Sequence, residues 1–271
     1  MKLLICTDGS TNSIETADLI SKLRFPQNSR MTVLGVSESQ NDLDKLVASM
    51  DMIDEKFVPL YLVERKIRNG DSIKEIMSEA LESTYDLVAV GGGGQLGLLH
   101  PKLGSTTSKL ARKLHTHFLV ARNVPKKVSK VLFCTGTEAP ASMTMTLGGE
   151  WISNTDAQIG LLHVLPEKSG DAHVADALHE KTTHGNNEHH DSILTQASQQ
   201  LKDAGVKNEI LLRIRQGLIV EEVIKELTDG GYELLVIGAH YQPGQDHWQG
   251  ALLDDVTDQL LNRCTCSVLI I

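Results

Sequence analysis

The sequence predicts an α/β protein in which two tandem, doubly wound domains each contain an open parallel sheet covered by helices. Three observations lead to this fold class. Residues 2–10 (KLLICTDGS) resemble residues 130–138 (KVLFCTGTE), so the chain repeats itself. Within each copy, short continuous apolar runs alternate with longer segments of helical periodicity. The length of 271 residues suits two domains, since domains most often have about 100 to 150 residues.

The repeat continues along the chain with one insertion. Cys6 aligns with Cys134 at an offset of 128 residues, and Arg68 aligns with Arg215 at an offset of 147, so the second copy contains 19 additional residues. They fall around residues 167–192, a polar, His-rich segment that we expect to be a loop or a helical arm. Its histidines lack the regular i, i+4 spacing of a helical metal site, so we predict no metal there.

A linker separates the two copies. Residues 122–130 (RNVPKKVSK) are few, basic and contain Pro125, which is typical of a segment between domains. We therefore predict an N-terminal domain at residues 1–125 and a C-terminal domain at residues 126–271.

The elements of the N-terminal copy follow from its periodicity. Continuous apolar runs predict strands that are buried on both faces of a parallel sheet, and they occupy residues 3–6, 32–36, 86–90 and 117–121. Helical spacing is found at residues 13–23, 41–56, 72–83 and 107–114. Together with the repeated segment 65–76, which aligns with 212–223, this pattern indicates about five strands in each copy.

Turn signals follow three of the expected strands in the N-terminal copy. They are the sequence Asp8-Gly9-Ser10, the single Gly70, and the run from Gly91 to Gly94. Ligands of doubly wound sheets bind at the carboxyl ends of strands, where the strand order reverses. We therefore expect a ligand site among these turns.

The glycine run and a second glycine turn suggest an anion site. Gly91 and Gly94 flank the first turn, and Gly104 precedes a helix at which Ser105 or Thr106 would serve as helix cap or phosphate donor. Loop amides and a helix N-terminus carry partial positive charge, and glycines let the backbone approach a ligand. The glycines by themselves favour a structural turn, since glycine-rich strand ends occur in many α/β proteins. The pattern is neither a P-loop nor G-x-G-x-x-G.

The spacing Gly91-x2-Gly94-x9-Gly104-Ser105 resembles the ATP-binding signature of the universal stress protein family, G-x2-G-x9-G-[ST], and the similarity extends over both copies. The resemblance implies an adenine nucleotide alpha hydrolase-like fold. It implies ATP, or ADP or AMP, as the ligand, and Mg²⁺ would accompany the phosphates without a strong sequence signal.

Two further positions take a role from this resemblance. Asp8 follows the first strand, where the family has an aspartate that contacts the adenosine part of the nucleotide. Val36 matches the position whose backbone contacts adenine in ATP-binding members. For Asp8, a cap of the helix at residues 13–23 is the competing interpretation. The predicted nucleotide-binding residues are Asp8, Val36, Gly91, Gly94, Gly104, Ser105 and Thr106.

The second copy has lost this signature. The replacements are Gly136 for Asp8, Tyr241 for Gly94, and Asp254 with Asp255 for Gly104 with Ser105. Two carboxylates in a phosphate pocket would repel the ligand. We therefore predict one nucleotide site per chain, in the N-terminal copy. Because members of the family dimerise through their last strands, the resemblance also implies that the two copies form an intramolecular pseudo-dimer; a further homodimer is left open.

Composition excludes several classes of function. The net charge of −9 argues against nucleic-acid binding, which depends on clustered Lys and Arg. No apolar run is long enough for a membrane span, and the turn at Asp8 comes too early for a signal peptide, so we expect a cytoplasmic protein. The cysteines are expected to be buried free thiols, with Cys264-x-Cys266 as a weaker redox or metal candidate.

The resemblance favours a nucleotide-dependent stress-response or signalling protein. A slow ATPase or phosphotransferase that uses the same pocket is the alternative, although no paired base and nucleophile is evident and we predict no catalytic residue. A nucleotide-free scaffold is the third hypothesis, which the intact glycine signature disfavours.

Overall fold

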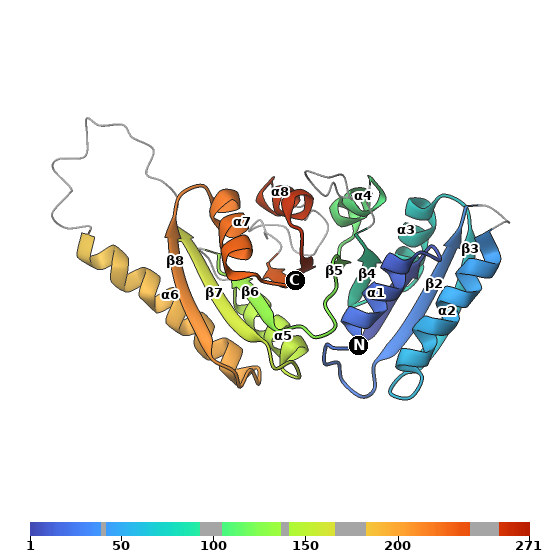
Figure 1. Cartoon of the computed structure of the whole chain (residues 1–271), viewed down its shortest axis with the longest axis horizontal. Coiled ribbons are helices and arrows are strands. Elements are labelled where there is room, and N and C mark those ends of the chain that lie inside the picture. Colours follow the sequence, from blue (N-terminus) through green and yellow to red (C-terminus); the bar gives the residue numbers. More distant parts are fainter. Residues whose placement is uncertain (39–41, 93–104, 137–140, 166–182, 239–254) are drawn as a thin grey trace.

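The computed structural model describes residues 1–38, 42–92, 105–136, 141–165, 183–238 and 255–271. In these residues one ten-stranded sheet runs through the whole molecule, with helices on both faces (Figure 1). The order of its strands is β3-β2-β1-β4-β5-β10-β9-β6-β7-β8.

The N-terminal half alternates strands and helices as predicted. Its strands are β1 (Lys2–Thr7), β2 (Arg30–Ser37), β3 (Leu62–Asn69), β4 (Leu87–Gly91) and β5 (His117–Ala121). Its helices are α1 (Thr11–Ile20), α2 (Leu43–Phe57), α3 (Ser72–Glu82) and α4 (Ser105–Lys113). All neighbouring strands of this half are parallel, and the strand order reverses between β1 and β4.

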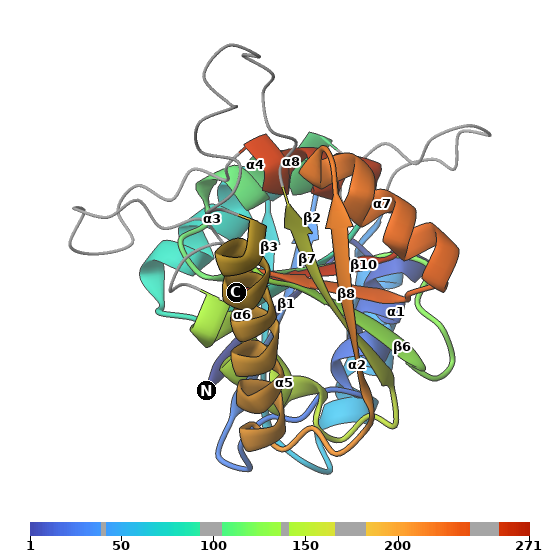
Figure 2. The same cartoon turned by 90° about the vertical axis from the view of Figure 1, so that its left-hand side faces the viewer.

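The C-terminal half repeats this arrangement. Its strands are β6 (Lys130–Cys134), β7 (Gln158–Leu165), β8 (Ile210–Gln216), β9 (Leu234–Ile237) and β10 (Ser267–Ile270). Its helices are α5 (Ala141–Ile152), α6 (Thr183–Asp203), α7 (Ile219–Gly230) and α8 (Asp255–Arg263). Figure 2 shows β7 and β8 between α6 and α7. The predicted α/β class, with two doubly wound units, is thereby confirmed.

The two halves join through their last strands. β5 and β10 pair antiparallel, with Leu119 opposite Leu269, as the pseudo-dimer prediction requires. The helices α4 and α8 lie side by side at this junction (Figure 1), where Arg112 and Asp258 form an ion pair with an N–O distance of 2.5 Å. The pseudo-dimer is therefore one continuous sheet.

Apolar layers cover both faces of this sheet. In β1, Leu3 and Ile5 face the layer formed with α1, α2, α5 and α6, while Leu4 and Cys6 face the layer formed with α3, α4, α7 and α8. Alternate side chains of a strand point to opposite faces, so a strand covered on both sides reads as a continuous apolar run. This is why the central strands were predictable from the sequence.

The edge strand β3 does not follow that pattern. It contains the consecutive charged residues Glu64, Arg65 and Lys66, and Leu62 and Ile67 are exposed, because an edge strand has less protein packed around it. The apolar runs used for prediction therefore did not include β3. Of the expected insertion at 167–192, residues 183–192 belong to α6, and residues 166–182 lie outside the described part.

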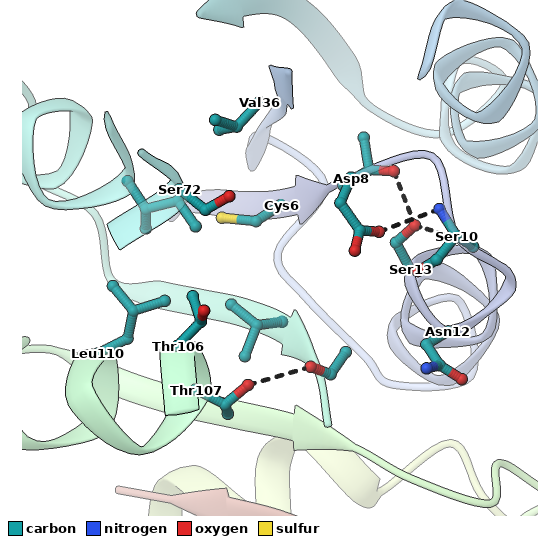
Figure 3. Close-up of a pocket in the computed structure, with 14 residues that line it drawn as sticks. Cys6, Asp8, Ser10, Asn12, Ser13, Val36, Ser72, Thr106, Thr107 and Leu110 are labelled. Carbon is teal, nitrogen blue, oxygen red and sulfur yellow. Dashed lines mark hydrogen bonds between the residues drawn. The ribbon is translucent and has the colours of Figure 1, made fainter. Parts of the chain in front are cut away.

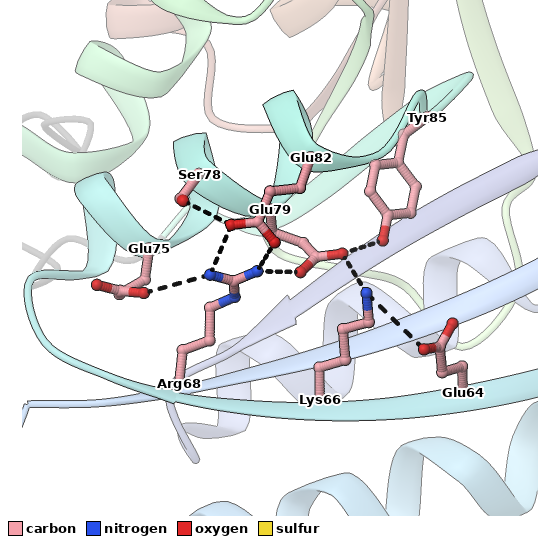
Figure 4. Close-up of polar contacts among 8 residues, drawn as sticks. All are labelled: Glu64, Lys66, Arg68, Glu75, Ser78, Glu79, Glu82 and Tyr85. Carbon is pink, nitrogen blue, oxygen red and sulfur yellow. Dashed lines mark hydrogen bonds and ion pairs between the residues drawn. The ribbon is translucent and has the colours of Figure 1, made fainter.

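A buried carboxylate ties β3 to α3. Glu79 is fully buried and accepts hydrogen bonds from Lys66 Nζ (2.8 Å), Arg68 Nη2 (2.7 Å) and Tyr85 Oη (2.6 Å), as Figure 4 shows. The C-terminal half repeats the arrangement around Glu226, which accepts hydrogen bonds from an arginine of β8 and from a tyrosine. The duplication indicates that this network stabilises the fold.

Two global features concern the expected class of protein. All four cysteines are free, and Cys6, Cys264 and Cys266 are buried. None of the helices, within the residues that the structure describes, has the length and apolar character needed to cross a membrane.

Candidate functional site

A pocket of about 320 Å³ opens at the carboxyl ends of β1, β2 and β4 in the N-terminal half (Figure 3). β1 and β4 are the strands between which the order reverses, so the pocket lies where doubly wound sheets bind ligands. Side chains from α1, α3 and α4 complete its walls.

The pocket brings together four of the residues predicted from the sequence. Asp8, Val36, Gly91 and Thr106 all line it, although they come from four separate segments of the chain. Ser105 is the first residue of α4. The remaining predicted positions, Gly94 and Gly104, lie outside the described residues.

Helix capping at the site differs from two expectations. Asp8 is not the cap of α1, because the N-cap is Ser10, whose backbone N–H donates to Asp8 Oδ1 at 3.0 Å. Nor do Ser105 and Thr106 precede α4, since they are its first two residues. Asp8 thus stands one residue beyond the strand β1, with an exposed carboxylate next to the first turn of α1 (Figure 3).

Three hydroxyl groups hold the turn that carries Asp8. Thr7 Oγ1 hydrogen-bonds to Ser13 Oγ at 2.7 Å and to Ser49 Oγ at 2.8 Å, which joins β1 to both α1 and α2. Gly9 donates its backbone N–H to Thr7 Oγ1 and has a φ of 82°, a conformation that glycine adopts without strain. The position of Asp8 is therefore set by buried contacts.

One side of the pocket is apolar. Cys6, Val36, Ile76 and Leu110 are buried side chains that line it, from β1, β2, α3 and α4. Burial raises the pKa of the Cys6 thiol well above its usual value, so Cys6 contributes an apolar surface and not a thiolate. Such a surface can accept a planar, weakly polar group.

The opposite side contains glycine and helix N-termini. A Cβ atom added to Gly91 would lie 3.1 Å from the backbone carbonyl carbon of Asn12, so a larger residue there would push β4 and α1 slightly apart. Thr107 Oγ1 donates to the Gly91 carbonyl at 3.3 Å and fixes α4 against β4. The first turns of α1 and α4 thereby both reach the pocket.

The charge of the pocket is low. Asp8 is the one ionisable acid or base, apart from the Cys6 thiol, among the lining residues that the structure describes. Binding of an anion would therefore rely on backbone amides and on the partial positive charge of the α1 and α4 N-termini. No group of three His, Cys, Asp or Glu suited to hold a metal was found in the described ranges.

Several lining residues were missed from the sequence. The polar ones are Thr7, Asn12, Ser13, Ser72 and Thr107, in addition to the apolar residues above. Asn12 and Ser72 lie at the starts of α1 and α3, the helices that follow β1 and β3, and that position is the signal that could have drawn attention to them. The Ser72 hydroxyl donates to Glu38 Oε1 at 2.9 Å, which adds an acidic group near the pocket.

The equivalent positions of the C-terminal half are different. α8 begins at Asp255, where α4 begins at Ser105, so the alignment of the two carboxylates with the glycine signature holds at this residue. Val256 then corresponds to Thr106. Thr135 Oγ1 is hydrogen-bonded to the buried His163 Nδ1 at 2.7 Å, whereas its counterpart Thr7 contacts two serines. Residues 137–140 and 239–254 lie outside the described part.

Comparisons with known proteins agree with this duplicated architecture. A family model described as the universal stress protein family matches residues 1–122 and 129–271. A solved protein of unknown function from Pseudomonas aeruginosa covers 100% of this chain and 92% of its own length, with 16% identity and a TM-score of 0.68. A universal stress protein from Archaeoglobus fulgidus covers 99% and 97%, with 14% identity and a TM-score of 0.62.

A shorter solved structure aligns with part of the chain. It is a universal stress protein in complex with cAMP, which covers 53% of this chain and 96% of its own, with 22% identity and a TM-score of 0.39. No protein matched in the search of curated sequences. Since the family model covers both halves, the chain belongs to the universal stress protein family, as two tandem copies of the family's fold.

Proposed function

We propose that this protein binds an adenine nucleotide, ATP or its products ADP and AMP, in the pocket of its N-terminal half, and that it acts as a nucleotide-dependent stress-response or signalling protein. One observation carries the proposal. Asp8, Val36, Gly91 and Thr106, from four segments of the chain, line one pocket of about 320 Å³ at the point where the strand order reverses. That volume lies within the ~300–1,000 Å³ typical of small-molecule sites.

The two sides of the pocket fit the two ends of such a ligand. The apolar side with Val36, Ile76 and Leu110 suits an adenine ring, and the Asp8 carboxylate can accept hydrogen bonds from ribose hydroxyls. Gly91 and the N-terminus of α4 suit the phosphates, which backbone amides and the helix dipole stabilise. Mg²⁺ with ATP would be held mainly by phosphate oxygens, with few protein ligands.

Nucleotide binding at such a site can switch the protein between conformations without any chemical reaction. Bound nucleotide stabilises the competent conformation by RT ln(1 + [L]/Kd), so the cellular nucleotide level sets how much of the protein is in that state. Turnover is the less supported alternative. The described lining residues provide one carboxylate, Asp8, and a thiol whose pKa is raised by burial, which together make no activated nucleophile.

The C-terminal half supplies substitutions that test the site. Asp8→Gly and Thr106→Val each introduce the residue found at the equivalent position of the other half, so both are compatible with the fold. We expect each to weaken Mg-ATP binding roughly tenfold or more in calorimetry, since a hydrogen bond to a charged group contributes ~1.5–3 kcal/mol. Val256→Thr, the reverse change in the C-terminal half, is the matched control and should leave the affinity unchanged.

Nucleotide identity is decided on the purified wild-type protein. Protein prepared without added ligand is denatured and the released nucleotide is identified by chromatography; Mg-ATP, ADP, AMP and cAMP are then compared by thermal shift. Absence of released nucleotide together with no thermal shift would favour the nucleotide-free scaffold and contradict the proposal. Steady formation of ADP from ATP by the wild type, and none by Asp8→Gly, would favour the slow ATPase.

A further inference from the structure

The glycine segment at the end of β4 rests on an arginine that belongs to the junction between the halves. A Cβ atom added to Gly92 would come within 2.4 Å of Arg122 Cγ and 2.6 Å of its Nε, so the arginine side chain lies directly against Gly92. Gly92 also donates its backbone N–H to the Ala121 carbonyl at 2.8 Å. The preceding residue, Gly91, lines the pocket.

The C-terminal half holds this arginine in place. Ser267 Oγ accepts a hydrogen bond from the Arg122 backbone N–H and donates one to its carbonyl, both at 3.0 Å. Arg122 Nη1 donates to the Cys264 carbonyl at 2.6 Å, and Asn123 Nδ2 donates to the Thr265 carbonyl at 2.8 Å. Four hydrogen bonds therefore fix the Arg122 segment to residues 264–267.

Burial of the Arg122 side chain costs more free energy than a purely structural contact would warrant. Arg122 is only 7% exposed, and its Nη2 has no hydrogen-bond partner in the described part of the chain. Burying a charged group with an unpaired donor costs free energy, so such a group calls for an explanation beyond packing. Its position between Gly92 and Cys264 supplies one.

We propose that Arg122 is a positioning residue through which the C-terminal half sets the affinity of the N-terminal pocket for its nucleotide. This inference rests on the proposed function. The Arg122 side chain packs against Gly92, Gly92 follows the pocket residue Gly91, and hydrogen bonds with Ser267 and Cys264 hold Arg122. The half that lost the signature thereby acquires a role in the site of the other half.

The test compares affinity with stability in full-length variants. Arg122→Met removes the guanidinium but keeps the aliphatic stem, Arg122→Lys keeps the stem and the charge, and Ser267→Ala removes two hydrogen bonds from the C-terminal side. We expect Mg-ATP affinity to fall roughly tenfold in Arg122→Met and severalfold in Ser267→Ala, with partial rescue in Arg122→Lys, if one to two hydrogen bonds of ~1 kcal/mol position the segment.

A matched control separates positioning from general loosening of the junction. Asp258→Asn weakens the ion pair with Arg112, which also joins the halves, whereas the atoms nearest to Gly92 belong to Arg122 and Val120. This variant should lose stability and keep wild-type affinity. If Arg122→Met and Ser267→Ala also keep wild-type affinity while melting at lower temperature, Arg122 is only structural and the inference is wrong.

Hydrogen exchange gives a second readout that affinity alone does not. Because coupling between two sites is reciprocal, Mg-ATP should slow amide exchange in residues 264–270 of the wild type, and should do so much less in Arg122→Met. Unchanged exchange in that segment of a nucleotide-bound wild type would contradict the inference. A wild type that binds no nucleotide would instead contradict the proposed function, and the inference with it.

Discussion

At the scale of single residues, the duplication separates structural roles from ligand-binding ones. Glu79 and Glu226 occupy equivalent positions, and each accepts hydrogen bonds from an arginine of the adjacent edge strand and from a tyrosine. Asp8 and Thr106, by contrast, are replaced by a glycine and a valine in the second half. Residues common to both halves therefore maintain the shared fold, and polar residues confined to one half are the candidates for binding.

The buried network predicts a specific dependence of stability on pH. Burial by itself would raise the pKa of Glu79, but hydrogen bonds from Lys66, Tyr85 and Arg68 lower it to about 2 from an ordinary value of 4.5. Because the pKa in the folded state is the lower one, this stabilisation is complete above ~pH 5 and is lost as pH falls towards 2. We expect Glu79→Gln to be less stable by about 2 kcal/mol at pH 7 and to show a flatter pH profile.

Chemical denaturation between pH 2.5 and 7 measures this difference. Glu82→Gln is the control, since Glu82 pairs with the same Arg68 but its side chain is 54% exposed, and it should behave nearly as the wild type. A Glu79→Gln profile parallel to that of the wild type would show that the network does not couple folding to protonation.

At the scale of elements, burial decides what the sequence reveals. The central strands are covered on both faces and appear as apolar runs, whereas β3 and β8 lie at the edges of the sheet and contain charged residues. The helical pattern at residues 13–23 extends past the end of α1 because Leu23, beyond the helix, is still buried in the core. The apolar periodicity therefore indicates which residues are buried, and it indicates where a helix ends only indirectly.

The same reasoning explains which parts of the pocket were predictable. Asp8, Gly91 and Thr106 follow strand ends or begin a helix within a recognisable spacing, and Val36 came from the family resemblance. For Asn12 the signal was weaker: it lies at the start of a helix, but the sequence does not say which side of α1 faces a cavity. Its closeness to Gly91 is a consequence of packing between α1 and β4.

The equivalent helices α3 and α7 differ in their N-cap residues, and this difference predicts the effect of substitutions there. α3 has Asp71 as its N-cap, whose carboxylate accepts a hydrogen bond from the Lys74 backbone N–H at 3.0 Å. α7 has Leu218 at the equivalent position, 67% exposed, with nearly the same φ and ψ and no side-chain cap. We expect Leu218→Asp to raise stability by about 0.5–1 kcal/mol and Asp71→Ala to lower it by about 1 kcal/mol, measured by thermal unfolding. Equal or lower stability of Leu218→Asp would contradict this.

At the scale of the whole molecule, contacts on both faces of the sheet make the two halves one structure. Besides the β5–β10 pairing, the Trp151 ring lies 5.6 Å from the Phe25 ring, and the Arg24 backbone N–H donates to the Trp151 carbonyl at 2.6 Å. Trp151 is 1% exposed, so this contact belongs to the core. A core and a backbone ladder that cross the junction should make unfolding cooperative across both halves.

This cooperativity predicts that shortening a side chain at the junction has a different effect on unfolding from shortening one elsewhere. The wild type should unfold in one calorimetric transition. Trp151→Ala should lower stability by about 3–5 kcal/mol and divide unfolding into two transitions, because the cavity weakens the contact between the halves. Phe57→Ala, at a fully buried aromatic residue inside the N-terminal half, should cost a similar amount yet keep one transition, since the junction is intact. Two transitions in the wild type, or one in Trp151→Ala, would show that the Trp151 contact does not couple the halves.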